Sequence, residues 1–541
     1  MKKILIYLTI QLLAVNLCSA QEPTEFPYLN ANQVIGIYNT GGDAISLSLI
    51  DYRTIDNKDV YLVSYFDDTQ SQLEVVATRG SRFVGASSSN GNTFFVFEHK
   101  QLQNVQIVRL NQARQLAYGE FTRKEALDFR GNAIGIETNQ DGQLFIMSNY
   151  TVLGLDDKGK TIVIERGSEV LSYNAELAQT GKYRLEGIGS FIAASPIEKG
   201  IVISYETKVP KEKKYNLELF IFNNALTLKG KHLLTDNGSF FPSEIISHNN
   251  EIIMAGYNMK NTIFDSEKTE GIFVRILNID GTVKNTSEYS WDQLKTELKN
   301  TGRGDFIFNG KKTVLIEKII PTDVGFQLIG ESYSSNSGVT AGEVLLGESG
   351  DKRNVISVFD FVIFETSGSG ELTTVSILEK EPMNIEVKGG ASYLRGLALE
   401  NQLKRHKAFP FQSVKDNKIT FINYRNKQGT LAEIDIATGV VTNGASIILE
   451  PVIVKEVTIT DERTADSKIL TKLDNIQQKS DNLDAKLNRF GEKLTYGLEK
   501  IDYVFNPSVK WDLGWHTLDN GKTIVYLYYP TRYSIYYASL N

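Results

Sequence analysis

The chain has 541 residues, 41% of them hydrophobic, and its 65 acidic and 58 basic side chains give a formal net charge of -7. A mildly acidic chain has no net positive field to attract phosphates, which argues against a nucleic-acid binder. Cys18 is the single cysteine, so the chain cannot form an internal disulfide. Stability must come from core burial, for which a chain of this length has ample apolar residues.

The first segment, "MKKILIYLTIQLLAVNLCSA", has two lysines, an apolar run and small residues before Gln21, which is the layout of a secretory signal peptide over residues 1–20. We expect cleavage after Ala20 and an exported protein, periplasmic or extracellular. Lipidation of Cys18 is the alternative, but Leu17 precedes it where the lipoprotein signals carry a small residue. The run is too short to span a bilayer and no later stretch qualifies, so we expect no transmembrane segment.

Residues 21–460 repeat one unit, in which a short apolar strand, a polar turn and a second apolar strand follow one another. Seven copies are arguable, among them "FVGASSSNGNTFFVFEHK", "FIAASPIEKGIVISYET" and the looser "LIDYRTIDNKDVYLVSYF". A second hairpin follows, as in "YTVLGLDDKGKTIVIE" and "FVRILNIDGTVKNT". Four strands in about 50 residues make an antiparallel sheet of propeller-blade size. Such a sheet is apolar on both faces, so it needs neighbours on both sides, which a ring supplies.

The chain therefore resembles the β-propeller superfold, and in particular the divergent secreted bacterial β-propeller proteins, a family of unknown function. It has no Trp-Asp dipeptides of the WD type and no kelch or sialidase boxes. We predict an all-β fold, a β-propeller of seven four-stranded blades over residues 21–460, followed by an amphipathic helix over 461–501 and a small aromatic-rich β-hairpin module over 502–541. A sandwich or an array of small β domains is the alternative. The resemblance transfers no active site.

Three insertions interrupt the repeat. "SWDQLKTELKNTG" predicts a short surface helix with Ser290 as N-cap and Gly302 where the helix ends. The Gly- and Ser-rich stretch 332–354 predicts a long loop, and residues 392–409 predict a second helix that Pro410 halts.

The segment before the C-terminal module has apolar residues at alternating steps of three and four, which is a heptad core with one polar break at Ser480. About three heptads is the lower limit for a coiled coil, so the helix either lies against the blades or mediates self-association or binding of a partner helix through residues 466–500. The candidate interaction residues are Leu473, Ile476, Leu483, Leu487, Phe490 and Leu494.

The C-terminal stretch is dense in aromatic residues. Trp511 and Trp515 precede an Asp519-Asn520-Gly521 turn, after which Ile524, Tyr526 and Tyr528 alternate as in a strand. The aromatics form either a stacking platform for sugar rings or a partner surface, or else they are the core of a small β module, because aromatic residues are favoured in strands. Trp511 and Trp515 complete the candidate interaction surface.

No local motif identifies a reaction. The five histidines are far apart, and no His-Glu-x-x-His pair, Gly-x-Ser-x-Gly elbow or phosphate loop occurs, so we predict no metal and no cofactor and name no catalytic residue. Asp280 in "LNIDGTV" lacks the spaced oxygen ligands of a calcium loop. It predicts a hairpin turn of the fifth blade instead.

The sequence therefore predicts an exported binding or scaffold module for a protein or glycan partner. The alternative is a carbohydrate-active enzyme, similar to glycoside hydrolases, in which carboxylates from different blades converge at the centre of the ring.

Overall fold

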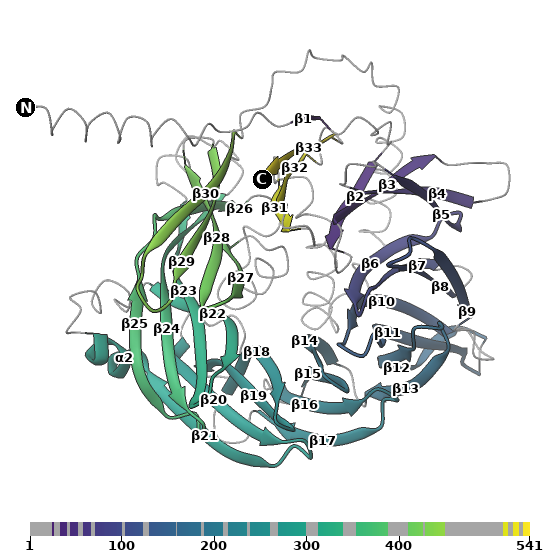
Figure 1. The fold of residues 1–541 in the computed structure, drawn as a ribbon. Helices are drawn as coiled ribbons and strands as arrows, with labels where there is room; N and C mark the ends of the chain where they lie inside the picture. The colour runs from purple at the N-terminus through teal and green to yellow at the C-terminus, as the bar shows by residue number, and fades with distance from the viewer. Residues whose placement is uncertain are drawn as a thin grey trace, which may run out of the picture.

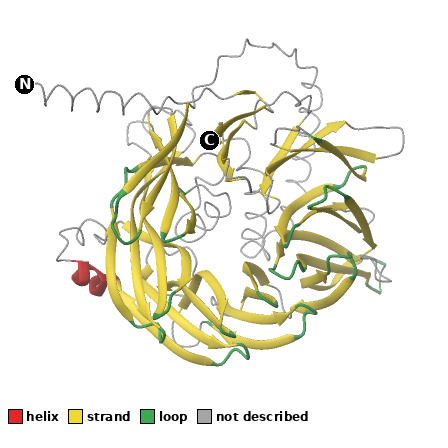
Figure 2. Ribbon diagram, in the orientation of Figure 1, coloured by secondary structure: helices red, strands yellow, loops and turns green. Residues whose placement is uncertain are grey.

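The computed structural model confirms an all-β propeller in which seven antiparallel sheets follow one another around a ring (Figures 1 and 2). In each sheet the strands are hydrogen-bonded in chain order, and we call these strands a to d from the first to the last. The structure describes the following residues: 24–25, 33–39, 44–51, 58–65, 71–99, 103–122, 129–157, 159–185, 189–208, 215–234, 239–259, 269–298, 312–338, 353–387, 409–425, 428–448, 512–517, 523–529 and 534–540.

The first four blades lie on the purple and blue side of Figure 1. Blade 1 consists of β2 (Gln33–Asn39), β3 (Ala44–Asp51), β4 (Lys58–Tyr65) and β5 (Gln72–Thr78). Blade 2 consists of β6 (Arg82–Ser89), β7 (Asn92–His99), β8 (Asn104–Asn111) and β9 (Leu116–Thr122). Blade 3 consists of β10 (Phe129–Thr138), β11 (Leu144–Leu155), β12 (Thr161–Tyr173) and β13 (Gln179–Leu185). Blade 4 consists of β14 (Gly189–Ile197), β15 (Gly200–Lys208), β16 (Tyr215–Asn223) and β17 (Leu228–Leu233).

The remaining three blades continue the ring in teal and green. Blade 5 consists of β18 (Ser239–His248), β19 (Glu251–Met259), β20 (Thr269–Asn278) and β21 (Val283–Ser290). Blade 6 consists of β22 (Lys312–Pro321), β23 (Gly325–Gly338), β24 (Arg353–Ser367) and β25 (Leu372–Leu378), with β26 (Met383–Val387) as a fifth strand against β24. Blade 7 consists of β27 (Phe411–Lys415), β28 (Lys418–Arg425), β29 (Gln428–Asp435) and β30 (Val441–Ile448).

Each a strand carries a one-residue β-bulge at the same point of its pairing with strand b. In blade 3 the register steps from Ala133 to Gly135, and in blade 5 it steps from Pro242 to Glu244. The other five blades show the same shift. A bulge bends the strand and increases its twist. The residue before each bulge, such as Ala133, Pro242 or Phe411, is therefore an equivalent position that recurs around the ring.

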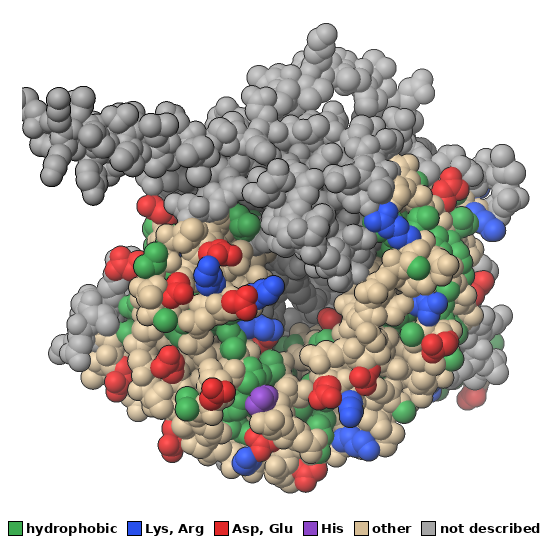
Figure 3. Space-filling model, in the orientation of Figure 1, with side chains coloured by type: hydrophobic (Ala, Val, Ile, Leu, Met, Phe, Trp, Pro, Cys, Tyr) green, Lys and Arg blue, Asp and Glu red, His purple; other side chains and the backbone are tan. Residues whose placement is uncertain are grey.

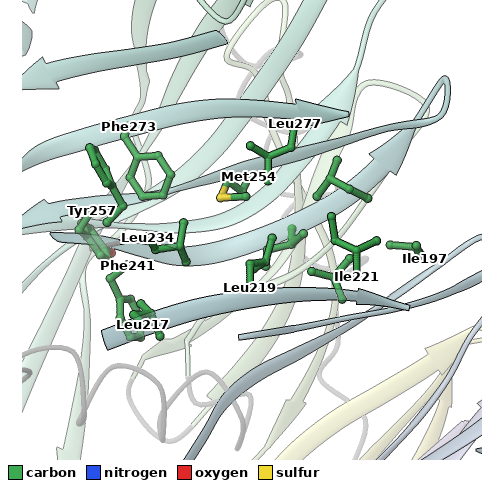
Figure 4. Close-up of a cluster of buried hydrophobic side chains, with 14 residues drawn as sticks. Ile197, Leu217, Leu219, Ile221, Leu234, Phe241, Met254, Tyr257, Phe273 and Leu277 are labelled. Atoms are coloured by element: carbon green, nitrogen blue, oxygen red, sulfur yellow. The ribbon is translucent and has the colours of Figure 1, made fainter. Parts of the chain in front are cut away.

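The hydrophobic core lies between blades. Apolar side chains of adjacent blades interdigitate in one cluster at each of the six junctions from blades 1 and 2 to blades 6 and 7. Figure 4 shows the cluster between blades 4 and 5, where Leu217 and Leu219 of β16 meet Phe241 of β18 and Met254 of β19. This packing is the physical reason for the ring, because both faces of each central blade are apolar and each needs a partner.

The c–d turns of blades 2 to 6 share one geometry, and the turn at Asp280 is one of them. In blade 5 Gly281 donates its N–H to the Asn278 carbonyl and adopts a φ of +84°, a left-handed conformation that favours glycine. Equivalent turns begin at Asn111, Asn174, Asn223 and Ser367, whereas in blade 7 the turn is one residue longer and Gly439 donates to the Asp435 carbonyl. Asp280 accepts hydrogen bonds from the Thr282 N–H and hydroxyl, which lower its pKa. The prediction that Asp280 is the corner of the fifth blade's outer hairpin is confirmed.

The predicted surface helix is also confirmed, but it ends at Glu297 with Leu298 as its C-cap, before the predicted end at Gly302. α2 (Trp291–Glu297) has Ser290 as its N-cap, and Ser290 and Gln293 form a reciprocal capping box. Leu294 and Leu298 are buried in the cluster between blades 5 and 6. At seven residues α2 is far shorter than a membrane-crossing helix, and no helix within the described ranges is long and apolar enough to cross one.

The structure corrects three strand predictions. "LIDYRTIDNKDVYLVSYF" and "YTVLGLDDKGKTIVIE" join strands b and c of blades 1 and 3, and neither is an a–b or c–d hairpin. The periodicity misassigned them because a b–c hairpin has the same order of apolar strand, polar turn and apolar strand. The long loop predicted from residue 332 begins later, because β23 continues to Gly338 and pairs with β24, which starts at Arg353.

The two ends of the chain form an eighth sheet. β31 (Asp512–Thr517) and β32 (Thr523–Tyr529) form the hairpin expected around the Asp-Asn-Gly turn, β33 (Ser534–Leu540) adds to β32, and β1 (Thr24–Glu25) adds to β33. Figure 1 shows this sheet in the sector between β30 of blade 7 and β2 of blade 1. Its strand order follows that of a blade whose outermost strand comes from the N-terminus.

Candidate functional site

The predicted interaction residues are not brought together within the described part of the chain. Trp515 lies in β31, opposite Val525 of β32. Trp511 and the heptad residues Leu473, Ile476, Leu483, Leu487, Phe490 and Leu494 lie outside the described residues, as do residues 392–408 of the second expected helix. The heptad helix, its self-association and the aromatic surface stay predictions.

The two faces of the ring are built differently. One face carries the a–b turns and the c–d turns, which are short and share a repeated geometry. The other face carries the connections between strands b and c, whose lengths differ from blade to blade: they run from residues 426–427 in blade 7 to residues 339–352 in blade 6. Connections that vary on a rigid framework are where proteins usually place binding residues.

The b–c connection of blade 3 is a hairpin that extends beyond its own blade. β10 pairs with β11 only as far as Val152, and β13 pairs with β12 only as far as Ser168. Among the described residues, residues 153–155 of β11 and 161–167 of β12 therefore pair only with the other strand of this hairpin. We call residues 153–167 the blade-3 hairpin. An unpaired strand edge offers free backbone donors and acceptors to another chain.

Aliphatic side chains on the blade-3 hairpin are exposed to solvent. Leu155 is 70% exposed and Ile164 is 59% exposed, while Ile162 and Val163 are 42% and 43% exposed. A bulge at Ile164 lets its side chain lie over Gly154, where a Cβ would come 2.2 Å from its Cδ1 atom. Exposed apolar residues gathered on one element indicate an interaction site rather than ordinary surface. The sequence reasoning missed this site, although the run "TIVIE" directly after a polar turn was its signal.

The base of the hairpin is fixed by polar contacts. The Tyr150 hydroxyl donates to Glu165 Oε1 at 2.5 Å, and the Arg184 guanidinium lies 4.8 Å from the centre of the Tyr150 ring. Burial and the Glu165 carboxylate raise the pKa of Tyr150 well above its usual range. The tyrosine therefore stays protonated and holds the hairpin to the blade at any physiological pH.

Two buried carboxylates fasten one blade to the next. Glu98 of β7 accepts the N–H of Ala133 in blade 3 at 2.8 Å, while Arg82 bonds both Glu98 Oε2, at 3.1 Å, and the Ala133 carbonyl. Glu331 of β23 accepts the N–H of Phe411 in blade 7 at 3.3 Å. Ala133 and Phe411 are both residues that precede a bulge, so the contact repeats in equivalent positions.

Glu331 also meets a buried lysine. Lys380 Nζ lies 3.4 Å from Glu331 Oε1 and both side chains are inaccessible to solvent. Burial raises the pKa of Glu331 and lowers that of Lys380, while each charge favours the ionised form of the other. Such a pair costs desolvation on both sides, and removing either partner would leave an uncompensated buried charge.

The centre of the ring carries charges of both signs. Figure 3 shows a hollow at the centre with acidic and basic side chains around it. Glu244 and Lys318, which follow the bulges of blades 5 and 6, form an ion pair at 3.3 Å. Among the described residues, no three His, Cys, Asp or Glu side chains gather as a metal would require. The convergent carboxylates that a saccharide-cleaving enzyme requires stay a prediction.

No protein-family model and no curated protein matches the sequence. Solved structures are similar to the chain at low sequence identity and with TM-scores below 0.5. The β-propeller domain of the Trilobed protease from Pyrococcus furiosus is 10% identical, with a TM-score of 0.34 over 76% of this chain and 97% of that one. The acylaminoacyl peptidase of Pyrococcus horikoshii is 10% identical, with a TM-score of 0.36 over 94% of this chain and 59% of that one.

A third match, the apocarotenoid oxygenase of Synechocystis, is 9% identical, with a TM-score of 0.32 over 65% of this chain and 74% of that one. The chain spans about six tenths of the acylaminoacyl peptidase and almost all of the protease's propeller domain. The protease, peptidase and oxygenase names belong to those proteins.

Proposed function

We propose that the chain is an exported β-propeller that binds a protein partner on the face carrying the b–c connections, with the blade-3 hairpin as the main contact. The observation that carries this proposal is the group of exposed aliphatic residues, Leu155, Ile162, Val163 and Ile164, on a hairpin that leaves its blade. Aliphatic side chains suit a protein surface better than a sugar, which would call for aromatic stacking. The ring then acts as a rigid scaffold that presents the hairpin.

Several features support a rigid scaffold. The blades are joined by apolar clusters, by the Glu98 and Glu331 contacts and by turns that dock on the preceding blade. Gly230 of β17 shows how closely one such turn docks, because a Cβ there would lie 2.2 Å from the backbone carbon of Asp280 in blade 5. Because the blades hold one another in place, the propeller loses little conformational entropy when a loop on it binds a partner.

Site-specific photo-crosslinking in the exporting cell tests the proposal. A photoreactive residue is placed at Ile162 or Ile164, and as a matched control at Val324, which is 82% exposed in the a–b turn of blade 6 on the opposite face. We expect one defined crosslinked protein from the hairpin positions and none from Val324. Equal crosslinking at all three positions, or none from the hairpin of a correctly folded and exported chain, would refute it. Specific binding in a parallel glycan and peptidoglycan screen, without crosslinks, would favour the glycan partner instead.

A further inference from the structure

An acidic residue recurs at one position of strand b in blades 2, 4 and 6. In each case it directly follows the residue that pairs with the position before the a-strand bulge: Glu98 follows Phe97, Glu206 follows Tyr205 and Glu331 follows Gly330. All three side chains are buried. The repeat of the fold thus places three glutamates in equivalent surroundings, each on the face that meets the next blade.

Glu206 faces blade 5 as Glu98 faces blade 3. Its cross-strand partner is Leu217, and directly opposed residues of an antiparallel pair lie on the same face. Leu217 packs against Phe240 and Phe241 of β18 in blade 5. In the same way Val105, the partner of Glu98, packs with Ala133 of blade 3.

The donor that Glu98 and Glu331 use is missing opposite Glu206. In blades 3 and 7 the residue before the bulge, Ala133 or Phe411, gives its backbone N–H to the glutamate. In blade 5 the equivalent residue is Pro242, which has no N–H. Within the described residues the structure shows no hydrogen bond or ion pair to the Glu206 carboxylate.

Among the described residues, no charge compensates the buried carboxylate either. Burial raises the pKa of Glu206 to about 7. On the neighbouring strands, Glu218 of β16 pairs with Lys231, Glu244 of β18 with Lys318 and Glu251 of β19 with Lys284, while His248 at the end of β18 contacts the Asn249 side chain. The residues that oppose Glu206 on β14 and β16 are Ser190 and Leu217, which carry no charge.

We propose that Glu206 is a proton-binding site that makes the junction between blades 4 and 5 sensitive to pH. In mildly acid surroundings the carboxyl is neutral and the junction stays packed. Near and above neutral pH the buried group ionises with nothing to stabilise its charge, so opening of the junction to water becomes more frequent. Glu98 and Glu331 differ from Glu206 because each accepts a backbone N–H from the next blade, a contact that favours the charged form of a carboxylate.

Hydrogen exchange measured by mass spectrometry on the mature chain tests the proposal, with β18 (Ser239–His248) as the reporter and labelling times corrected for the intrinsic effect of pH. From pH 6 to pH 8 the wild-type opening equilibrium at β18 should increase about tenfold, as expected for release of one proton from a group with a pKa near 7. The junction between blades 2 and 3, reported by β10, should not change over the same interval.

Two variants separate the proton from general stability. Glu206→Gln removes the titrating group and should abolish the tenfold change at β18. Pro242→Ala keeps the carboxyl but supplies the missing N–H, so it should also abolish the change, with less opening at pH 8 than in the wild type. A wild-type junction that does not respond to pH, a Glu206→Gln variant that still responds, or a Pro242→Ala variant that responds like the wild type would each overturn the proposal.

Discussion

Replacing Glu206 with glutamine should stabilise the protein in a pH-dependent way. The pKa of this glutamate rises from 4.5 to about 7 on folding because the side chain is buried. Its neutral form is therefore favoured in the folded state, and the stability present below pH 4.5 is lost as the pH rises towards 7. Each pH unit of this interval is worth about 1.4 kcal/mol, so the cost of ionisation reaches about 3 kcal/mol above pH 7. Glu206→Gln removes that cost.

The melting temperature is the quantity to measure. With an unfolding entropy of about 2.1 cal/mol/K per residue, a propeller of roughly 440 residues loses about 0.9 kcal/mol of stability for each degree near its midpoint. Glu206→Gln should therefore raise the melting temperature by about 3 °C at pH 8 and leave it nearly unchanged at pH 4.5. Calorimetry of both proteins at the two pH values gives the comparison directly.

Glu98→Gln is the matched control, because it makes the same chemical change at the equivalent position of blade 2. Glu98 carries charge-assisted bonds from Arg82 and from the Ala133 N–H, so its loss should destabilise the protein by about 1.5–3 kcal/mol at pH 8. At pH 8 the change in stability should therefore have opposite signs: Glu206→Gln should raise the melting temperature and Glu98→Gln should lower it. A Glu206→Gln variant that melts lower than the wild type at pH 8 would contradict it.

Four further substitutions probe the ring. Gly230→Ala should lower stability by about 1–3 kcal/mol, because its Cβ meets the backbone of the blade 5 turn. Gly368→Ala is its control and should change stability little, because the nearest atom to its Cβ, the Val324 carbonyl oxygen, would lie 4.0 Å away; thermal melts compare the two variants. Ser290→Ala should cost about 1 kcal/mol through loss of the capping box, measured by urea unfolding. Lys380→Met should raise the already elevated pKa of Glu331 further and cost about 3–5 kcal/mol at neutral pH, with part of the loss recovered on acidification.

The sequence predicted the strands well because apolar runs and polar turns report directly on antiparallel hairpins. It gave no means of telling a b–c hairpin from an a–b or c–d hairpin, so blades 1 and 3 were assigned to the wrong strand pairs. The a-strand bulges could not be predicted, because the skipped residues, which include Val84, Ile192 and Gln412, share no chemical type. The bulge positions are equivalent because of how each a strand pairs with its b strand, and the spacing of residues along the chain does not reveal this.

The buried glutamates and the exposed residues of the blade-3 hairpin could not be predicted for the same reason, because both depend on how the strands pair. Glu98, Glu206 and Glu331 are three of 65 acidic residues, and only the shared register shows that they occupy one position in three blades. The exposed aliphatic residues of the blade-3 hairpin matched the pattern of a buried strand, because the sequence does not show where the neighbouring strands stop. A repeat sequence predicts which residues are apolar, while the ends of the ladders decide which of them reach solvent.

Because the blades repeat one structure, the proline at position 242 can be compared with the residues at the same position of other blades. In a single irregular fold, a proline beside a buried glutamate would be one local detail among many. In this ring, Ala133 and Phe411 show what the position before the bulge does when it has an N–H, and Pro242 shows the same position without one. The comparison within one chain holds the surrounding architecture nearly constant and changes the donor. Among the described residues, Glu206 therefore differs from the other two glutamates in its partners: it has neither the backbone N–H nor a cation such as Arg82 beside Glu98 or Lys380 beside Glu331.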